Sequence, residues 1–477
     1  MKKFIKWLII SLLTFTSFFV IYYIKKLNIL DIKYLFIFAG VVTLLCALNL
    51  FKLLRKKTSK PSRIIFGIFS LLLIIIYGFI CRYSSSTIDF VKKATKLKIE
   101  TVNYSVLVLK DTDYKDILDL TDKKIGFLST DNNLNDSVKV LKNKFKFENV
   151  DYEDIGTLLG ELYNNELNAI SINDAYISLL EESNNEFVKN YKVIYTYQVS
   201  VKVKDNKVNK VDFTKDPFIV YISGTDSRGT VSDVSRSDVN IIAVINPTTH
   251  KILLVSTPRD YYVQLHGTTG IKDKLTHAGV YGIDMSKNTM EDLLDINIDN
   301  VVKVSFRTVV NLVDTIDGID INSDTEFTAT SELTRNKCYY VEGNNHLNGD
   351  CALRYARERK TYTTGDRHRG QNQQQVITAI VEKMTNPKYL IRYNQILKNI
   401  DGTIETDINY EQITELAKYE LTNLSKWSVE SISLDGEGAM LPTYSMGYNL
   451  PLYVMIPNEE TVNNAKNKIN EYLSTNN

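Results

Sequence analysis

Three long apolar runs fill most of the first 82 residues and constrain the fold more than any other feature of the chain. They cover residues 4–24, 34–51 and 64–81. At about 1.5 Å per residue, each run is close to the length that crosses a hydrocarbon core of roughly 30 Å, and the short middle run is expected to recruit Leu30 and its neighbours. We therefore predict a membrane region, residues 1–83, with three transmembrane helices.

The basic residues between these runs predict an orientation. Six Lys or Arg lie in residues 52–63, whereas residues 25–33 hold three. The positive-inside rule then places the N-terminus in the cytoplasm and everything after Arg82 outside, in a multi-pass protein of the cell membrane. A cleaved signal peptide is the alternative for the first run, but no small-residue cleavage site follows it and two more runs come next.

Charge divides the chain in the same way. Residues 1–82 carry 13 basic and one acidic side chain, and the remaining residues carry 44 basic and 55 acidic, a net of −11. A nucleic-acid-binding domain would usually be basic, so nucleic acid is not expected as a partner.

Beyond the membrane region the patterns predict α/β structure. Residues 84–210 alternate strands and helices, which is typical of a smaller accessory domain with a largely parallel sheet; its first part, 83–99, reads as a polar stalk. Residues 211–400 predict a second, larger α/β domain with a mixed sheet flanked by helices, and residues 401–477 predict further strands and a helix packing on it.

One predicted hairpin brings charged residues together. Its strands, 238–245 and 251–257, flank a turn that sets Asn246 opposite Lys251 and, counting outward, Asp238 opposite Arg259. Asp226 ends the preceding strand, and the 11-residue loop between the two aspartates carries Arg236. The alternative is a surface salt bridge worth less than ~1 kcal/mol.

Residues 352–375 concentrate five arginines in an acidic part of the chain. If the chain is extended there, Arg357 and Arg359 point the same way. Arg354, one helical turn before Arg357, is expected as a structural ion-pair partner.

A helix predicted at residues 366–384 adds polar groups. Asp366, Arg369 and Gln373 share one face at about 100° per residue, and Val376 and Ile380 continue that face as an apolar stripe. The polar trio should therefore point inward at the helix N-terminus, which favours anions. Gln375 falls on the opposite face and His368 roughly 140° from the inward face, so both are expected in solvent.

Together these groups suit a pyrophosphate. An arginine guanidinium can donate two hydrogen bonds to phosphate oxygens, and carboxylates together with phosphate oxygens hold Mg²⁺, or Mn²⁺ in its place.

Cys338 and Cys351 bracket the loop before the arginines and are candidates for a disulfide in an oxidising compartment; separate buried thiols are the alternative.

The chain resembles the LytR-CpsA-Psr family over about residues 218–385. The resemblance rests on the ordered motifs GTDSRG, RSDVNIIAVINP, LVSTPRD, KLTHAGVYG, LVDTIDGIDI, HLNGDCALRYARER and GDRHRGQNQQQVI. The membrane spans and accessory domain are similar to its CpsA-like branch.

The resemblance implies an extracellular phosphotransferase. Such enzymes move a glycopolymer, such as teichoic acid or capsule, from polyprenyl pyrophosphate to peptidoglycan through a phosphodiester link. It implies Mg²⁺-linked aspartates at Asp226 and Asp238. It implies pyrophosphate-binding groups at Arg236, Arg259, Lys274, Arg357, Arg359, Arg369 and Gln373.

Two positions depart from the common family pattern. Asn372 stands where an arginine is usual, and Ser305 where many members have an acidic residue.

The attacking group would be a peptidoglycan hydroxyl, with Asp238 or Asp366 as candidate base. An apolar lipid pocket is expected beside the arginines, although the helix around residues 306–316 could equally be ordinary core.

The alternative function is a polyprenyl-phosphate-binding regulator or receptor without turnover. The aspartate pair weighs against it, because binding alone could rely on arginines. A DNA-binding attenuator is disfavoured by the acidic charge after residue 82.

Overall fold

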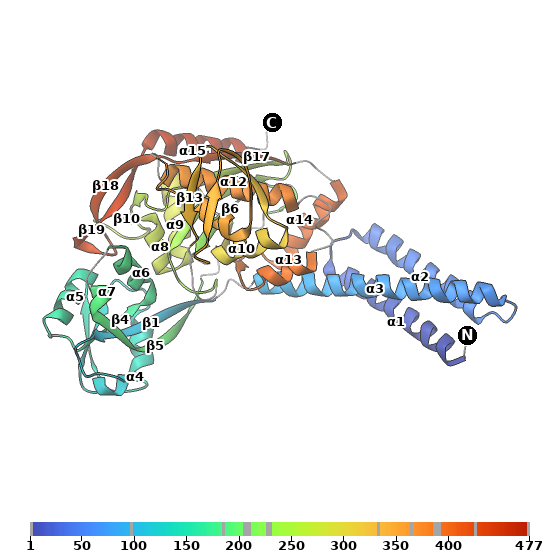
Figure 1. Ribbon diagram of the computed structural model, residues 1–477, viewed down its shortest axis with the longest axis horizontal. Helices are drawn as coiled ribbons and strands as arrows, with labels where there is room; N and C mark the ends of the chain where they lie inside the picture. The colour runs from blue at the N-terminus through green and yellow to red at the C-terminus, as the bar shows by residue number, and fades with distance from the viewer. Residues whose placement is uncertain are drawn as a thin grey trace.

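A computed structural model describes most of the chain. The described residues are 3–95, 99–183, 187–203, 211–225, 231–331, 334–362, 366–384, 393–423 and 427–474. Figure 1 shows a rod of three helices on one side, a small sheet unit below, and a larger α/β body that contains the C-terminal region.

The rod consists of α1 (Lys3–Leu27), α2 (Ile32–Leu54) and α3 (Lys60–Ala94). All three are long and apolar enough to cross a membrane. Leu13, Val20, Val42 and Leu73 pack between them, whereas many large apolar side chains, such as Ile68, stay on the outside. A helix surface of this kind is suited to lipid.

Helix α3 runs well past the predicted membrane span. It continues to Ala94, so the prediction of a polar stalk from residue 83 is wrong for its first twelve residues. Ser84, Ile88 and Val91 are buried along one side. Their spacing of four and three residues is that of an amphipathic helix, which the many serines and lysines around them obscured.

The small unit is a five-stranded sheet of order β3-β2-β4-β1-β5. Its elements are β1 (Ile99–Leu109), η1 (Ile117–Leu120), β2 (Lys124–Leu128), α4 (Leu134–Lys142), β3 (Glu148–Tyr152), α5 (Ile155–Tyr163), β4 (Ala169–Asn173), α6 (Asp174–Glu182), α7 (Phe187–Asn190) and β5 (Tyr191–Lys202). Strand β2 is parallel to β3 and β4, but β1 is antiparallel to β4 and β5. The expected largely parallel sheet is therefore mixed, because strand direction depends on nonlocal pairing.

The larger body is built on a six-stranded sheet of order β16-β11-β6-β7-β8-β17. Its strands are β6 (Phe218–Thr225), β7 (Ser237–Asn246), β8 (Lys251–Thr257), β11 (Asn300–Ser305), β16 (Ile404–Thr406) and β17 (Ser428–Ser433). Alternate residues of β7 enter two cores, Ile242 and Val244 on one face and Ile241 and Ala243 on the other. Burial on both faces explains why this strand reads as a continuous apolar run.

Shorter elements cover and connect this sheet. They are β9 (Tyr262–Val263), β10 (Asp273–Lys274), α8 (Leu275–Ala278), η2 (Gly279–Tyr281), α9 (Ile283–Leu294), α10 (Phe306–Thr315), β12 (Ile319–Ser323), β13 (Phe327–Thr330), β14 (Lys337–Tyr340), β15 (Gly343–Leu347), α11 (Gly349–Ala356), α12 (Asp366–Met384), α13 (Tyr393–Ile400), α14 (Tyr410–Asn423), β18 (Gly436–Thr443), β19 (Gly447–Pro457) and α15 (Glu459–Leu473). Residues after 400 supply both edge strands of the central sheet, β16 and β17.

Candidate active site

The first two charged groups of the site, Asp238 and Arg259, meet at the open end of the β7–β8 hairpin. Asn246 pairs with Lys251, which confirms the predicted register, and regular pairing ends at Asn240 and Thr257. Just beyond, Arg259 Nη1 donates to Asp238 Oδ1 over 2.9 Å, and Thr276 Oγ1 donates to the same oxygen over 3.1 Å. Both members of the ion pair are nearly buried. The contact is therefore an interior one rather than the surface salt bridge that was the alternative.

Arginines control the charge of Asp238. Burial alone would raise the pKa of this carboxyl group, but four nearby guanidinium groups outweigh burial and hold the pKa well below its ordinary value. They belong to Arg259, Arg236, Arg369 and Arg357. Asp238 is consequently an anion at any physiological pH.

Asp260 is a central residue that the sequence patterns did not single out. It is 1% exposed and gathers three cations from different segments: Lys274 Nζ at 3.3 Å, Arg259 Nε at 3.6 Å and Arg359 Nη1 at 3.7 Å. Burial would raise the pKa of Asp260, but the surrounding cations, Arg259 and Lys274 foremost, hold that pKa below its ordinary value. Its position directly after Arg259, in LVSTPRD, was the available signal.

Lys274, predicted to bind the pyrophosphate, is buried beside Asp260. It ends β10, is 1% exposed, and forms its ion pair with Asp260. Lys274 therefore belongs to the charged support of the arginines.

The turn after α11 presents the second pair of predicted arginines. Arg354 forms an ion pair with Glu358, as expected. Arg357 closes α11 with a helical backbone rather than an extended one, and its guanidinium lies 4.8 Å from the centre of the Phe306 ring. Glu358 Oε1 accepts the backbone N–H groups of Lys360 and Thr361. These bonds fix the turn that carries Arg357 and Arg359.

Helix α12 spans Asp366–Met384, the predicted bounds, and directs Arg369 inward; that residue is 8% exposed. Gly370 allows the helix to approach the sheet, since a Cβ there would lie 3.2 Å from Ser256 Oγ.

Gln375, expected on the solvent face, instead accepts a hydrogen bond from the Tyr355 hydroxyl. His368, expected to be exposed, stacks on Tyr362 with ring centres 3.4 Å apart.

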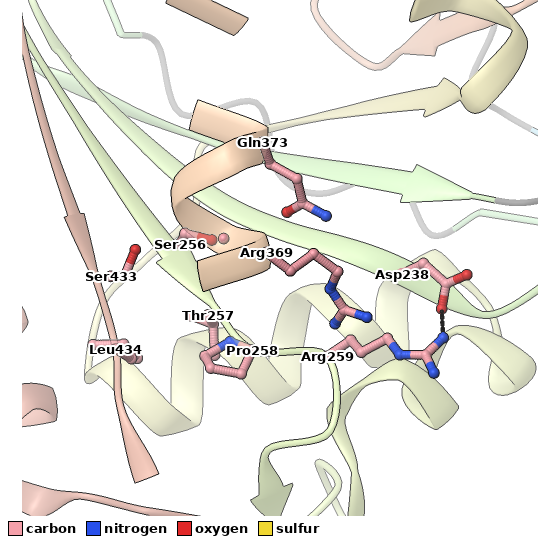
Figure 2. A pocket seen from close by; sticks show the side chains of 10 residues that line it. Asp238, Ser256, Thr257, Pro258, Arg259, Arg369, Gln373, Ser433 and Leu434 are labelled. Atoms are coloured by element: carbon pink, nitrogen blue, oxygen red, sulfur yellow. Dashed lines mark hydrogen bonds and ion pairs between the residues drawn. The ribbon is translucent and has the colours of Figure 1, made fainter. Parts of the chain in front are cut away.

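These side chains enclose a polar cavity of about 280 Å³. Its lining includes Asp238, Arg259, Phe306, Arg354, Arg357, Glu358, Arg359, Lys360, Arg369 and Gln373. A smaller adjoining pocket between the start of α12 and the ends of β8 and β17 is shown in Figure 2, where Arg369 and Gln373 extend from α12 beside the Arg259–Asp238 pair. The geometry is that of a binding site for a compact, highly charged anion.

Among the described side chains, two predicted site residues, Lys274 and Arg236, are not part of this lining. Arg236 lines a different groove, between the loop before β7 and α6, although its charge still acts on Asp238. Asp226 lies outside the described residues, and Asp366 is described only as the first residue of α12.

The two departures from the family pattern both lie in the interior. Asn372 is fully buried and donates to the Tyr355 carbonyl over 3.1 Å, so position 372 faces α11 rather than the cavity. Ser305 precedes α10, is 5% exposed, and its backbone N–H donates to the Thr403 carbonyl. On α10 itself, Val313 and Leu312 belong to the core, which favours core over a lipid pocket for that face.

Cys338 on β14 and Cys351 on α11 are joined by a disulfide, with Cα atoms 5.6 Å apart. The Tyr340 hydroxyl also donates to the Cys351 carbonyl. The disulfide thus fastens the β13–β14 hairpin to the helix that leads to Arg357.

Among the described residues, His, Cys, Asp and Glu side chains form no group of three or more that could hold a metal ion. Mg²⁺ in phosphoryl-transfer sites usually takes only one or two carboxylates and completes its shell with phosphate oxygens and water. Asp238 is an ionised carboxylate on the cavity wall, so the residues present fit a cation that arrives with a diphosphate.

Comparison with known proteins gives consistent matches. Residues 187–470 match the model of the LytR_cpsA_psr family. The polyisoprenyl-teichoic acid–peptidoglycan teichoic acid transferase TagU of Bacillus mycoides is 32% identical over 240 residues, 49% of this chain and 75% of the relative. TagV of Bacillus subtilis, which carries the same transferase name, is 32% identical over 244 residues, 50% of this chain and 62% of the relative. The crystal structure of B. subtilis TagV aligns with 54% of this chain and 98% of that one, at 29% identity and a TM-score of 0.45.

Proposed function

The chain belongs to the LytR-CpsA-Psr family, and from this we propose that it is a membrane-anchored phosphotransferase acting outside the cell. It would move a wall glycopolymer from polyprenyl pyrophosphate to peptidoglycan. The relatives TagU and TagV are named for teichoic acid; for this chain we propose the broader class of wall polymers, teichoic acid or capsule included. The basic residues in 52–63 support this orientation.

The observation that carries the proposal is the arginine-lined cavity. Arg259, Arg357, Arg359 and Arg369 converge there from three segments, and Asp238 lines the same cavity. Cleaving a diphosphate depends mainly on positioning and on neutralising phosphate charge. Arg259 and Arg359 are already placed by the buried carboxylates of Asp238 and Asp260, and such preformed guanidinium groups would supply both.

The reaction would form a phosphate ester bond to a peptidoglycan hydroxyl and break the anhydride bond, so that polyprenyl phosphate leaves. Asp238, with Asp226 as the second predicted ligand, would hold Mg²⁺ (or Mn²⁺), which neutralises phosphate oxygens when bound. The low pKa of Asp238 makes it a poor proton acceptor, and a bound cation would lower that pKa further. Of the two candidate bases, Asp366 is therefore preferred.

The test uses the full chain in proteoliposomes with a saccharide-linked polyprenyl pyrophosphate, peptidoglycan and Mg²⁺. We expect glycan on the peptidoglycan, lost with EDTA and reduced at least about a hundredfold in Arg359→Ala, as for removal of one transition-state donor. Arg307→Ala is the matched control, because Arg307 is an exposed neighbour of the cavity on α10. Tight lipid binding with neither transfer nor released polyprenyl phosphate would refute the transferase and favour the receptor.

A further inference from the structure

A second, apolar groove lies where the membrane helices meet the larger body. Its volume is about 730 Å³, and its walls come from the end of α1, the outer part of α3 and one side of α14. On α3 it reaches from Ile76 to Val91, about 22 Å of helix at 1.5 Å per residue. Ile413 and Ala417 of α14 form the opposite wall.

Three polar side chains in these walls are hydrogen-bonded within the protein. The Thr87 hydroxyl donates to the Tyr83 carbonyl over 2.9 Å, and the Thr414 hydroxyl donates to the Glu411 carbonyl over 3.0 Å. The Tyr410 hydroxyl lies 3.2 Å from the carbonyls of both Lys26 and Leu27, which anchors α14 to the end of α1. The surface that remains for an occupant is apolar, so water would be a poor one.

The end of the groove at Ile76 lies within the predicted membrane span, residues 64–81. Ile76 and Phe79 are 42% and 58% exposed on a helix that is apolar enough to cross a bilayer. The other end of the groove, at Val91, lies beyond that span and beside α14. A lipid chain could therefore enter from the outer leaflet and leave the bilayer along α3.

Helix α3 also gives this groove a fixed position relative to the arginine cavity. Phe90, directly before Val91, packs with Val309 and Leu312 of α10 in one core cluster. Helix α10 begins at Phe306, which lines the cavity beneath Arg357. The same rigid packing thus connects both sites.

We propose that this groove binds the isoprenoid chain of the lipid-linked donor where the chain leaves the outer leaflet. The inference rests on the proposed function, because that donor must keep its tail in lipid while its diphosphate reaches the arginines. Holding the chain at the membrane seam limits where the diphosphate can go and raises its local concentration at the cavity.

The experiment uses the full chain in proteoliposomes and donors with a long or a short, water-soluble isoprenoid chain. Ala417→Trp fills the groove, and Ile413→Trp fills it from another position in case the first variant does not fold. Ile68→Trp is the control, since Ile68 is 63% exposed on α3 and does not line the groove. We expect KM for the long-chain donor to rise about tenfold in the groove variants, because the affinity for that donor should fall by about the same factor. Turnover of the short-chain donor should not change.

A diazirine-bearing polyprenyl phosphate provides an independent readout. It should label α14 and the α3 segment 76–91, and excess phosphatidylglycerol should compete poorly. Equal competition by phosphatidylglycerol, or folded groove variants with unchanged long-chain KM, would overturn the groove as an isoprenoid site. A wild-type protein that transfers neither donor would instead refute the proposed function.

Discussion

Lys303 Nζ lies 2.7 Å from Glu100 Oε1, and this ion pair joins β11 of the central sheet to β1 of the five-stranded sheet. Both side chains are almost fully buried. The lysine also donates to the Asp233 carbonyl, and Glu100 Oε2 accepts the Ile283 backbone N–H over 2.9 Å. The two sheets therefore meet through a hydrogen-bonded charge pair at the loop that precedes β7.

Lys303→Met should destabilise the protein strongly. It would leave the buried Glu100 carboxylate without its cation, which typically costs about 3–5 kcal/mol. Lys93→Met is the matched control, because the Lys93–Asp401 pair lies at the surface, where an ion pair contributes little to stability. Thermal unfolding of both variants checks this, and equal midpoints would contradict it.

Asp260→Asn should also destabilise the protein, by about 3–5 kcal/mol, because it leaves the buried Lys274 ammonium without this counter-ion. Adding Lys274→Met should recover part of the loss, since it removes the uncompensated charge. A double-mutant cycle measured by thermal or chemical unfolding gives the coupling. Additive losses would show that the two groups act independently.

Asp238→Asn should produce a pH-dependent loss of stability. The folded state lowers the pKa of Asp238, so its charge contributes stability above its unfolded pKa of about 4, and this contribution is lost as pH falls through the lower, folded pKa. The gap in unfolding midpoint between variant and wild type should be widest at neutral pH and narrow below about pH 4. Asp151→Asn, at an exposed position, is the control. A gap that stays constant over this range would argue against the lowered pKa.

Reducing the Cys338–Cys351 disulfide should lower the stability of the region around α11. The two cysteines are 13 residues apart, and closing a loop of this size is worth about 3 kcal/mol. Unfolding with and without reductant measures the loss. The Cys338→Ser/Cys351→Ser variant should have the stability of the reduced protein, and reductant should not change that stability. If reductant still lowers the stability of this variant, the loss does not come from the Cys338–Cys351 disulfide.

Local patterns predicted the elements that depend on near neighbours. The register of β7 and β8 follows from two apolar runs and one turn, so the pairing of Asp238 with Arg259 could be predicted by counting residues outward from that turn. The bounds of α12 and the inward direction of Arg369 follow from helical periodicity. The ion pair of Arg354 and Glu358 is likewise an i,i+4 contact.

Where local patterns misled, a distant partner decided the outcome. Gln375 was expected in solvent, but the Tyr355 hydroxyl of α11 lies against it. Residues 83–94 read as a polar stalk, but tertiary packing of Phe90 and its neighbours keeps them in α3. Strand β1 takes a direction that no periodicity encodes.

Chain length, composition and residue spacing were enough to predict the three apolar helices, the charge division, the hairpin register and the arginine-rich segment. The packing of distant segments was needed to reveal that Asp260 collects Arg259, Lys274 and Arg359, and that Glu100 meets Lys303. These charges come from segments far apart in the chain. Burial makes their pairing strong, and burial depends on how the sheets pack rather than on local sequence.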